Sequence, residues 1–240
     1  MLQVHKEVEK VSKLITTKLA GLNVSIDVEL LIDVSGSTRD DFRQGRMEEI
    51  FQRVMAFANR VDPNKRVDVT AFSSNTVHCG EFDTSDFQGF MPKFMRAADS
   101  VLWDGTVYSK AFESIQKSRG EKIIKSVGGM FKSLFSSSEI SKPMQKTRLV
   151  IFITDGEDYG RAVEFYKAVE ANLADKSTFI LAIGVGKESH FSILEDADDK
   201  FHGFSFVFAK DYSKLNDDSF YDLLLSAEFV QWYKENGVSK

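Results

Sequence analysis

The strongest predicted strand of the chain is Arg148–Asp155, with the sequence RLVIFITD. A second strand of the same kind is Asn23–Asp33, NVSIDVELLID, and it also ends in a carboxylate. Near-continuous apolar runs of this length are typical of strands buried on both faces inside a parallel sheet. Because the carboxyl ends of parallel strands lie at one edge of a sheet, we expect Asp33 and Asp155 to point into the same crevice.

The segments around these two strands alternate between strand and helix patterns. Further strands are predicted at Arg66–Phe72, Thr76–Phe82, Thr178–Val185 and Phe204–Ala209. Apolar residues at helical spacing predict helices near residues 1–20, 40–62, 85–98, 107–116, 160–174 and 217–235. The alternation predicts an α/β fold: a doubly wound, mostly parallel central sheet of the Rossmann-like kind, with helices on both faces and one antiparallel edge strand.

The composition of the 240 residues is that of an ordinary globular protein. A net charge of −5 argues against a general nucleic-acid binder, and Cys79, as the single cysteine, cannot close an intrachain disulfide. Charges interrupt the N-terminal sequence MLQVHKEVEKVSKL, and no stretch is apolar enough to span a bilayer. We therefore expect a single cytoplasmic domain over 1–240, with an N-terminal helical extension at 1–22.

Hydroxyl groups surround the two strand-terminal carboxylates in the sequence. The run Asp33-Val-Ser35-Gly-Ser37 places one carboxylate and two hydroxyls on a tight loop, and Thr106 follows Asp-Gly before another predicted helix. With Asp155, this set consists only of oxygen ligands, which hard divalent cations prefer, and it offers no soft ligand that would favour zinc. Helix capping by the two aspartates is the plainer alternative, but capping does not require three converging hydroxyls.

These motifs resemble the metal-ion-dependent adhesion site of the von Willebrand factor A (vWA) domain family. The pieces are Asp33-x-Ser35-x-Ser37, Gly105-Thr106 and Thr154-Asp155-Gly156, in the order and on the elements where that family carries them. The resemblance covers roughly residues 23–235, and the flanking sequences are most similar to the intracellular copine-like and tellurium-resistance-associated branch. One departure is Asp104, where many members have glycine; its carboxylate either raises metal affinity or caps the next helix.

The resemblance implies a role for each ligand and a function for the domain. Ser35, Ser37 and Thr106 would touch the metal, whereas Asp33 and Asp155 would often act through water. A coordination position left open in this way would receive a Glu or Asp of a partner protein. We therefore expect a non-enzymatic protein-binding module that uses Mg²⁺, with Mn²⁺ or Ca²⁺ as alternatives, in a tellurium-resistance or stress-response system.

Two other functions compete with this expectation. A metal-assisted phosphohydrolase would use the same cluster, but the sequence places no general base or nucleophile beside it. A haloacid-dehalogenase-type phosphatase would need an aspartate at position 35, which is Ser35 here. A peripheral membrane protein would act instead through a basic insertion at residues 117–147.

This insertion departs from the composition of the rest of the chain. Residues 117–148 carry a net charge of +6, and residues 122–135 can form a helix with one apolar face. Such a helix would pack on its own domain, dock a partner or contact a membrane surface. The insertion ends where the Asp155 strand starts, so we expect it to lie away from the metal. Deleting residues 120–145 should then leave Mg²⁺ affinity nearly unchanged.

Overall fold

A computed structural model describes residues 2–20, 24–86, 89–116, 146–211, 215 and 217–237. Its strands are β1 (Ile26–Asp33), β2 (Arg66–Phe72), β3 (Thr76–Asp83), β4 (Thr147–Thr154), β5 (Thr178–Val185) and β6 (Phe204–Ala209). Of the insertion expected at 117–147, residues 117–145, with the expected helix at 122–135, lie outside the described residues, and Thr147 is the first residue of β4.

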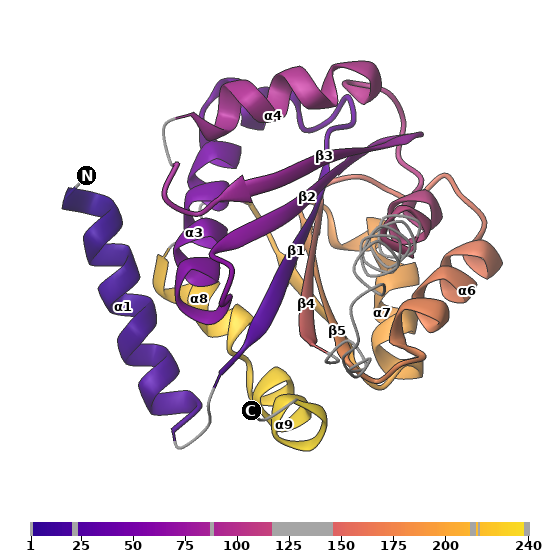
Figure 1. Cartoon of the computed structure of the whole chain (residues 1–240). Helices are drawn as coiled ribbons and strands as arrows, with labels where there is room; N and C mark the ends of the chain where they lie inside the picture. Colours follow the sequence, from indigo (N-terminus) through magenta and orange to yellow (C-terminus); the bar gives the residue numbers. More distant parts are fainter. Residues whose placement is uncertain are drawn as a thin grey trace, which may run out of the picture.

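The strands form one sheet in the order β3-β2-β1-β4-β5-β6 (Figure 1). Every neighbouring pair is parallel except β2 and β3, which join as an antiparallel pair at the edge. The predicted α/β class and the antiparallel edge strand are therefore confirmed. Because β1 and β4 are neighbours, their carboxyl ends, which bear Asp33 and Thr154, lie side by side.

Helices cover both faces of this sheet, as predicted. The first group is α1 (Leu2–Lys18), α2 (Arg39–Arg43), α3 (Arg46–Val61), α4 (Phe90–Ala98), α8 (Asp217–Leu224) and α9 (Ala227–Asn236), with a 3-10 turn at Asp99–Val101. The second group is a helix at residues 108–116, α6 (Ala162–Leu173) and α7 (Ser192–Lys200), with a 3-10 turn at Glu188–His190. Figure 1 shows the two groups on opposite sides of the sheet.

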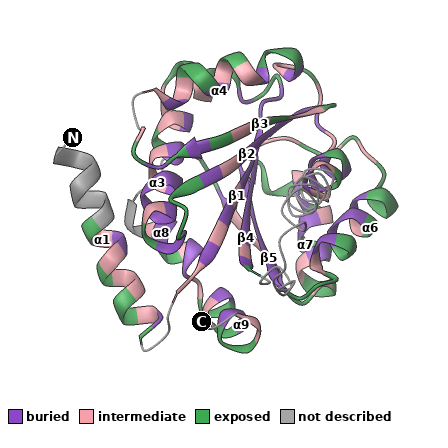
Figure 2. Cartoon of the chain, in the orientation of Figure 1, coloured by how far each residue is buried: buried purple, intermediate pink, exposed green. Residues whose placement is uncertain are grey.

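Successive strand residues supply two separate cores. On β4, Leu149, Ile151 and Ile153 pack against the first helix group, whereas Val150 and Phe152 pack against the second. The central strands β1, β4 and β5 are largely buried, whereas the edge strand β3 and the outer helix faces are more exposed (Figure 2). This explains why the strand sequences show near-continuous apolar runs rather than alternation.

Two predicted helices are each divided in two. The segment 40–62 breaks between α2 and α3 at Gly45, whose φ of +77° is a left-handed conformation that glycine adopts at little cost. The segment 217–235 breaks between α8 and α9, where the Ser226 side chain accepts a hydrogen bond from the Phe229 N–H at 3.1 Å and caps a new helix. Helical spacing alone did not reveal these breaks, because the apolar face continues on both sides of each.

Among the described helices, none combines the length and the hydropathy that crossing a bilayer requires.

Candidate metal centre

Three loops meet at the carboxyl edge of the sheet. The first, residues 33–37, follows β1; the second, residues 103–107, precedes the helix at 108–116; the third, residues 154–160, follows β4. Backbone hydrogen bonds join them, from Gly36 N–H to the Asp104 carbonyl and from Tyr159 N–H to the Thr106 carbonyl, each at 2.9 Å. All five side chains predicted as metal ligands lie on these loops.

The first loop turns its polar groups toward one another. The Ser35 N–H donates to Asp33 Oδ1 at 2.7 Å, and the Ser35 and Ser37 hydroxyls lie 3.0 Å apart. Asp33 and Ser35 are buried, whereas Ser37 is exposed. The loop therefore runs from a buried carboxylate to a hydroxyl at the surface.

Hydroxyl groups also link the first loop to the third. Ser37 Oγ donates to Asp155 Oδ1 at 2.7 Å, and Thr154 Oγ1 donates to Asp33 Oδ2 at 2.5 Å. In the sequence, Thr154 has no role of its own beyond membership of the motif Thr154-Asp155-Gly156. The structure shows that its hydroxyl fixes the buried aspartate across two neighbouring strands.

Thr106, the third predicted hydroxyl ligand, approaches the same place from the second loop. A Cβ atom added at Gly156 would lie 2.9 Å from Thr106 Oγ1, 3.6 Å from Ser37 Oγ and 3.7 Å from Asp33 Oδ2. Oxygen atoms from two separate loops therefore lie near one point beside Gly156, where a Cβ atom would come too close to Thr106 Oγ1. The donor set fits a small hard cation, with Ser35 and Asp155 hydrogen-bonded to the same cluster.

The buried environment of the two carboxylates in the cluster disfavours their ionised form. Burial raises the pKa of the Asp33 carboxyl to about 7, against hydrogen bonds from Ser35 and Thr154 that lower it. Burial also raises the pKa of Asp155, and the Ser37 hydroxyl opposes that shift. Among the described residues, no lysine or arginine forms a salt bridge with either carboxylate. A bound cation would supply the missing charge.

Two residues that support the loops were not predicted as part of the site. The Tyr108 hydroxyl donates to the Gly156 carbonyl at 2.5 Å. Asp158 Oδ1 accepts hydrogen bonds from the N–H groups of Tyr108, at 2.9 Å, and Gly160, at 3.0 Å. Asp158 therefore caps a helix that begins 50 residues earlier in the sequence. Nothing in the sequence singled out Tyr108.

Asp104, the departure from the family pattern, points away from the cluster. Its carboxylate accepts hydrogen bonds from the Ser74 hydroxyl and from the Gly105 N–H. These contacts lower its pKa and tie the second loop to the end of β2. Asp104 therefore holds the loop that carries Thr106 rather than adding a ligand.

Beside Asp155 lies a hollow of ≈390 Å³ with several charged residues in its lining. Its lining consists of Asp41, Arg46, Asp155, Val185, Gly186, Lys210 and Asp211. Arg46 forms a salt bridge with Asp41 and also donates to the Gln44 side chain. This hollow places charged residues on one flank of the cluster.

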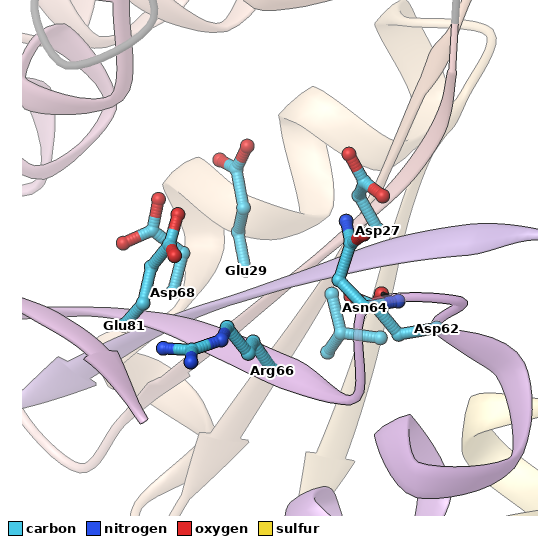
Figure 3. Close-up of a pocket in the computed structure, with 8 residues that line it drawn as sticks. Asp27, Glu29, Asp62, Asn64, Arg66, Asp68 and Glu81 are labelled. Carbon is cyan, nitrogen blue, oxygen red and sulfur yellow. Dashed lines mark hydrogen bonds between the residues drawn. The ribbon is translucent and has the colours of Figure 1, made fainter. Parts of the chain in front are cut away.

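A second hollow, of ≈350 Å³, lies at the amino ends of β1 and β2 and is rich in carboxylates (Figure 3). Its polar lining residues are Asp27, Glu29, Asp62, Asn64, Arg66, Asp68 and Glu81. Glu29, Asp68 and Glu81 are register neighbours on three adjacent strands. Within the described residues, no group of three or more His, Cys, Asp or Glu side chains is arranged to hold a metal ion, here or elsewhere.

Comparison with known families identifies the fold. The family model vWA-TerF-like, described as the vWA found in the TerF C terminus, matches residues 25–239. The chain belongs to the vWA-TerF-like family. The predicted vWA family is thus confirmed, whereas the finer placement beside copine-like domains stays a prediction. Domains of the vWA type commonly act as metal-dependent protein-interaction modules.

The chain is also similar to individual known proteins. The chain is 23% identical over 231 residues to the Bacillus subtilis (strain 168) protein "Uncharacterized protein YcbR", covering 95% of this chain and 85% of that protein. It is also similar in structure to BatB from Bacteroides thetaiotaomicron, with a TM-score of 0.52, 16% identity, and coverage of 88% of this chain and 100% of BatB.

Proximal thread matrix protein 1 (PTMP1) from the mussel byssus is similar with a TM-score of 0.55 and 17% identity, over 85% of this chain. The match spans 48% of PTMP1, so this chain corresponds to about half of that protein. At these identities the likeness concerns the fold.

Proposed function

We propose that this vWA-TerF-like domain is a non-enzymatic protein-binding module that captures an Asp or Glu side chain of a partner through a bound Mg²⁺. Asp33, Ser35, Ser37, Thr106 and Asp155 would hold the ion. The observation that carries the proposal is the convergence of oxygens of Thr106, Ser37 and Asp33 on one point beside Gly156.

The chemistry of the donors supports a cation that still attracts an outside anion. Three of the five groups are neutral hydroxyls, and each carboxylate already accepts a hydrogen bond from a hydroxyl, Thr154 on Asp33 and Ser37 on Asp155. Neutral donors cancel less of a cation's charge than direct carboxylates do. When bound, the metal supplies the positive charge that a partner's carboxylate would seek. Mn²⁺ or Ca²⁺ would satisfy the same oxygens.

The arrangement of the site supports binding rather than catalysis. The Asp33 and Asp155 carboxylates and the Ser35 and Ser37 hydroxyls are all engaged with one another or with backbone. A hydrolase would need a base or nucleophile placed against a substrate at this point. For the setting of the module, we propose a cytoplasmic tellurium-resistance or stress-response system; the TerF-like family name is in line with the first of these.

The test is capture of a partner by the full chain with Mg²⁺ and with EDTA. We expect immobilised wild-type protein to retain a specific partner from a cell extract in Mg²⁺ only, and Asp33→Ala to retain none. Asp27→Ala, a carboxylate at the opposite end of β1, is the matched control and should behave as wild type. Replacing single Asp and Glu residues of the eluted partner should then identify the captured side chain.

Two results would contradict the proposal. One is partner binding that persists unchanged in EDTA. The other is turnover of a generic phosphoester that requires Mg²⁺ or Mn²⁺ and is lost in Asp33→Ala, because this would show that the cluster is a hydrolytic centre.

A further inference from the structure

Two exposed apolar side chains lie on the segment that follows Asp155. They are Tyr159 and Val163, and we call the two residues the Tyr159 patch. Tyr159 is 75% exposed and Val163 is 59% exposed, and they are the exposed large hydrophobic side chains of the described residues. Single exposed apolar residues are common on protein surfaces, so their exposure alone carries no argument. Their position carries an argument, because Tyr159 lies on the loop that follows Asp155 and Val163 lies in the first turn of α6, directly after that loop.

The patch is joined directly to the loop of Thr106. The Tyr159 N–H donates to the Thr106 carbonyl at 2.9 Å. A Cβ atom at Gly105 would lie 3.9 Å from Cδ2 of the Tyr159 ring, so the ring lies over this loop. Consecutive Cα atoms are roughly 3.8 Å apart, and Gly105 immediately precedes Thr106. The ring is therefore about one or two residue spacings from a proposed ligand of the metal.

The backbone under the patch is held in place before any partner arrives. Asp158 Oδ1 accepts from the N–H groups of Tyr108 and Gly160, and the Tyr108 hydroxyl donates to the Gly156 carbonyl. These bonds fix both sides of Tyr159. A tyrosine on a fixed backbone offers contact area at a small entropic cost, which is typical of residues that dominate binding energy.

The two flanks of the cluster differ in chemistry. On the side of Asp155 that faces β5, the lining of the hollow includes Arg46 and Lys210 with their neighbouring aspartates. On the side of Thr106, the Tyr159 ring lies over Gly105. A partner that places a carboxylate between them therefore meets an aromatic ring in one direction and a group of charged residues in the other.

We propose that the partner's captured Asp or Glu lies within two residues of a large apolar side chain, which packs on Tyr159 and Val163. This inference rests on the proposed function and adds the sequence context that the site selects. The metal would bind the acid, and the Tyr159 patch would distinguish one acidic segment from another.

The test uses a defined probe, a phage-displayed library of 12-residue peptides with a fixed central Asp. The library is selected on the immobilised full chain in Mg²⁺ and eluted with EDTA, so that only metal-dependent binders are recovered. We expect enrichment of Phe, Trp, Tyr, Leu or Ile within two positions of the Asp. The best peptide should bind the Tyr159→Ser, Val163→Ser double variant about tenfold more weakly than wild type, a typical loss for a central contact.

Two variants serve as controls for this loss. Tyr159→Phe keeps the ring and should retain the affinity of wild type. Lys167→Ser alters another exposed residue of α6, beyond Val163, and should also bind as wild type. Circular dichroism and Mg²⁺ titration of each variant show whether the fold and the metal site are intact.

The outcomes separate this inference from the proposal on which it rests. Enriched peptides with no apolar preference near the Asp, or equal affinity of wild type and the double variant, would overturn the role of the patch and leave metal-dependent capture intact. Absence of EDTA-eluted binders, or equal binding to Asp33→Ala, would overturn metal-dependent capture and the role of the patch with it.

Discussion

The two ends of the central sheet both gather carboxylates, but they surround them with different groups. At the amino end, the hollow of Figure 3 has five acidic side chains in its lining. Cations stand beside them: Lys146 lies 3.1 Å from Asp27, and Arg148 lies 3.8 Å from Glu29. At the carboxyl end only two aspartates occur among the predicted ligands, and their partners are hydroxyls.

This difference indicates that a high number of acidic residues does not by itself make a cation-binding site. Lysine and arginine balance the carboxylates at the amino end, and an added cation gains little from charge that is already neutralised. The candidate ligand set at the carboxyl end has only two carboxylates, Asp33 and Asp155. Neutral oxygens converge with them, and among the described residues no lysine or arginine forms a salt bridge with either one. Convergence of small oxygen ligands, rather than the number of acidic residues, thus marks the candidate metal centre.

The sharpest test of this comparison removes one carboxylate at each end. We expect Asp33→Ala or Asp155→Ala to weaken Mg²⁺ binding by more than about 100-fold, because each loses a ligand or the anchor of one. Glu29→Ala, at the amino end, should leave Mg²⁺ affinity unchanged. Isothermal titration calorimetry on the EDTA-stripped chain measures all of these constants. Equal binding by wild type and Asp33→Ala would refute the site assignment.

A smaller loss of Mg²⁺ affinity should follow from adding a side-chain atom at Gly156, which removes no ligand. In Gly156→Ala the new Cβ would meet Thr106 Oγ1 at 2.9 Å, so the hydroxyl or the loop must shift. We expect Mg²⁺ affinity to fall about tenfold, as for other changes that displace a ligand slightly. Gly105→Ala is the matched control, since its Cβ would meet nothing closer than 3.9 Å. Equal loss in both variants would mean that the position of Gly156 has no special role.

The two ends should also differ in how stability depends on pH. Burial raises the pKa of Asp33 to about 7 and that of Asp62, at the amino end, to about 6, from 3.8. In each case the folded chain holds a proton that the unfolded chain has released. The free energy of unfolding of the metal-free protein should therefore decrease as pH rises from about 4 to about 7.

Single substitutions assign the two parts of this decrease. Asp33→Asn should remove the decrease between pH 6 and 7, whereas Asp62→Asn should flatten only the lower part. Urea unfolding in EDTA at several pH values measures both effects. Saturating Mg²⁺ should raise the stability of the wild type above pH 7 by mass action, and a chain whose stability ignores Mg²⁺ would contradict the proposed site.

The smallest expected effect concerns the support of the third loop. Tyr108→Phe removes the hydroxyl that donates to the Gly156 carbonyl and leaves the aromatic packing in place. We expect a loss of stability of about 1 kcal/mol, the usual effect of one buried hydrogen bond, and a weakening of Mg²⁺ binding of only about threefold. Thermal unfolding measures the loss of stability, and calorimetric titration with Mg²⁺ measures the loss of affinity. A loss as large as that of Asp33→Ala would make Tyr108 a direct part of the site.

The strands and the five candidate ligands could be predicted because their signals are local. Apolar runs such as 148–155 identify buried strands, and the strand-end position of Asp33 follows directly from the end of its run. Breaks in helices are harder to predict, since Gly45 and Ser226 interrupt the backbone and leave the spacing of apolar residues nearly intact.

The supporting contacts of the site depend on how distant loops meet, and local patterns do not contain this information. Thr154 and Asp33 are 121 residues apart, and Tyr108 and Gly156 are 48 apart. Any serine, threonine or tyrosine near a strand end has the chemistry for such a bond. Only the sheet order, with β1 between β2 and β4, shows which of them make one.

The adjacency of β1 and β4 has a consequence for synthesis on the ribosome. The strand that completes the pairing of β1 begins at Thr147, more than a hundred residues after β1 ends. At a synthesis rate of about 5 to 20 residues per second, β1 therefore has no partner strand along one edge for on the order of 10 s. Closing so distant a contact is intrinsically slow. The nascent chain therefore passes through a stage in which β1, β2 and β3 present an open hydrophobic edge to chaperones or to other chains. The candidate ligands Asp33 and Asp155 come together only after β4 has paired with β1.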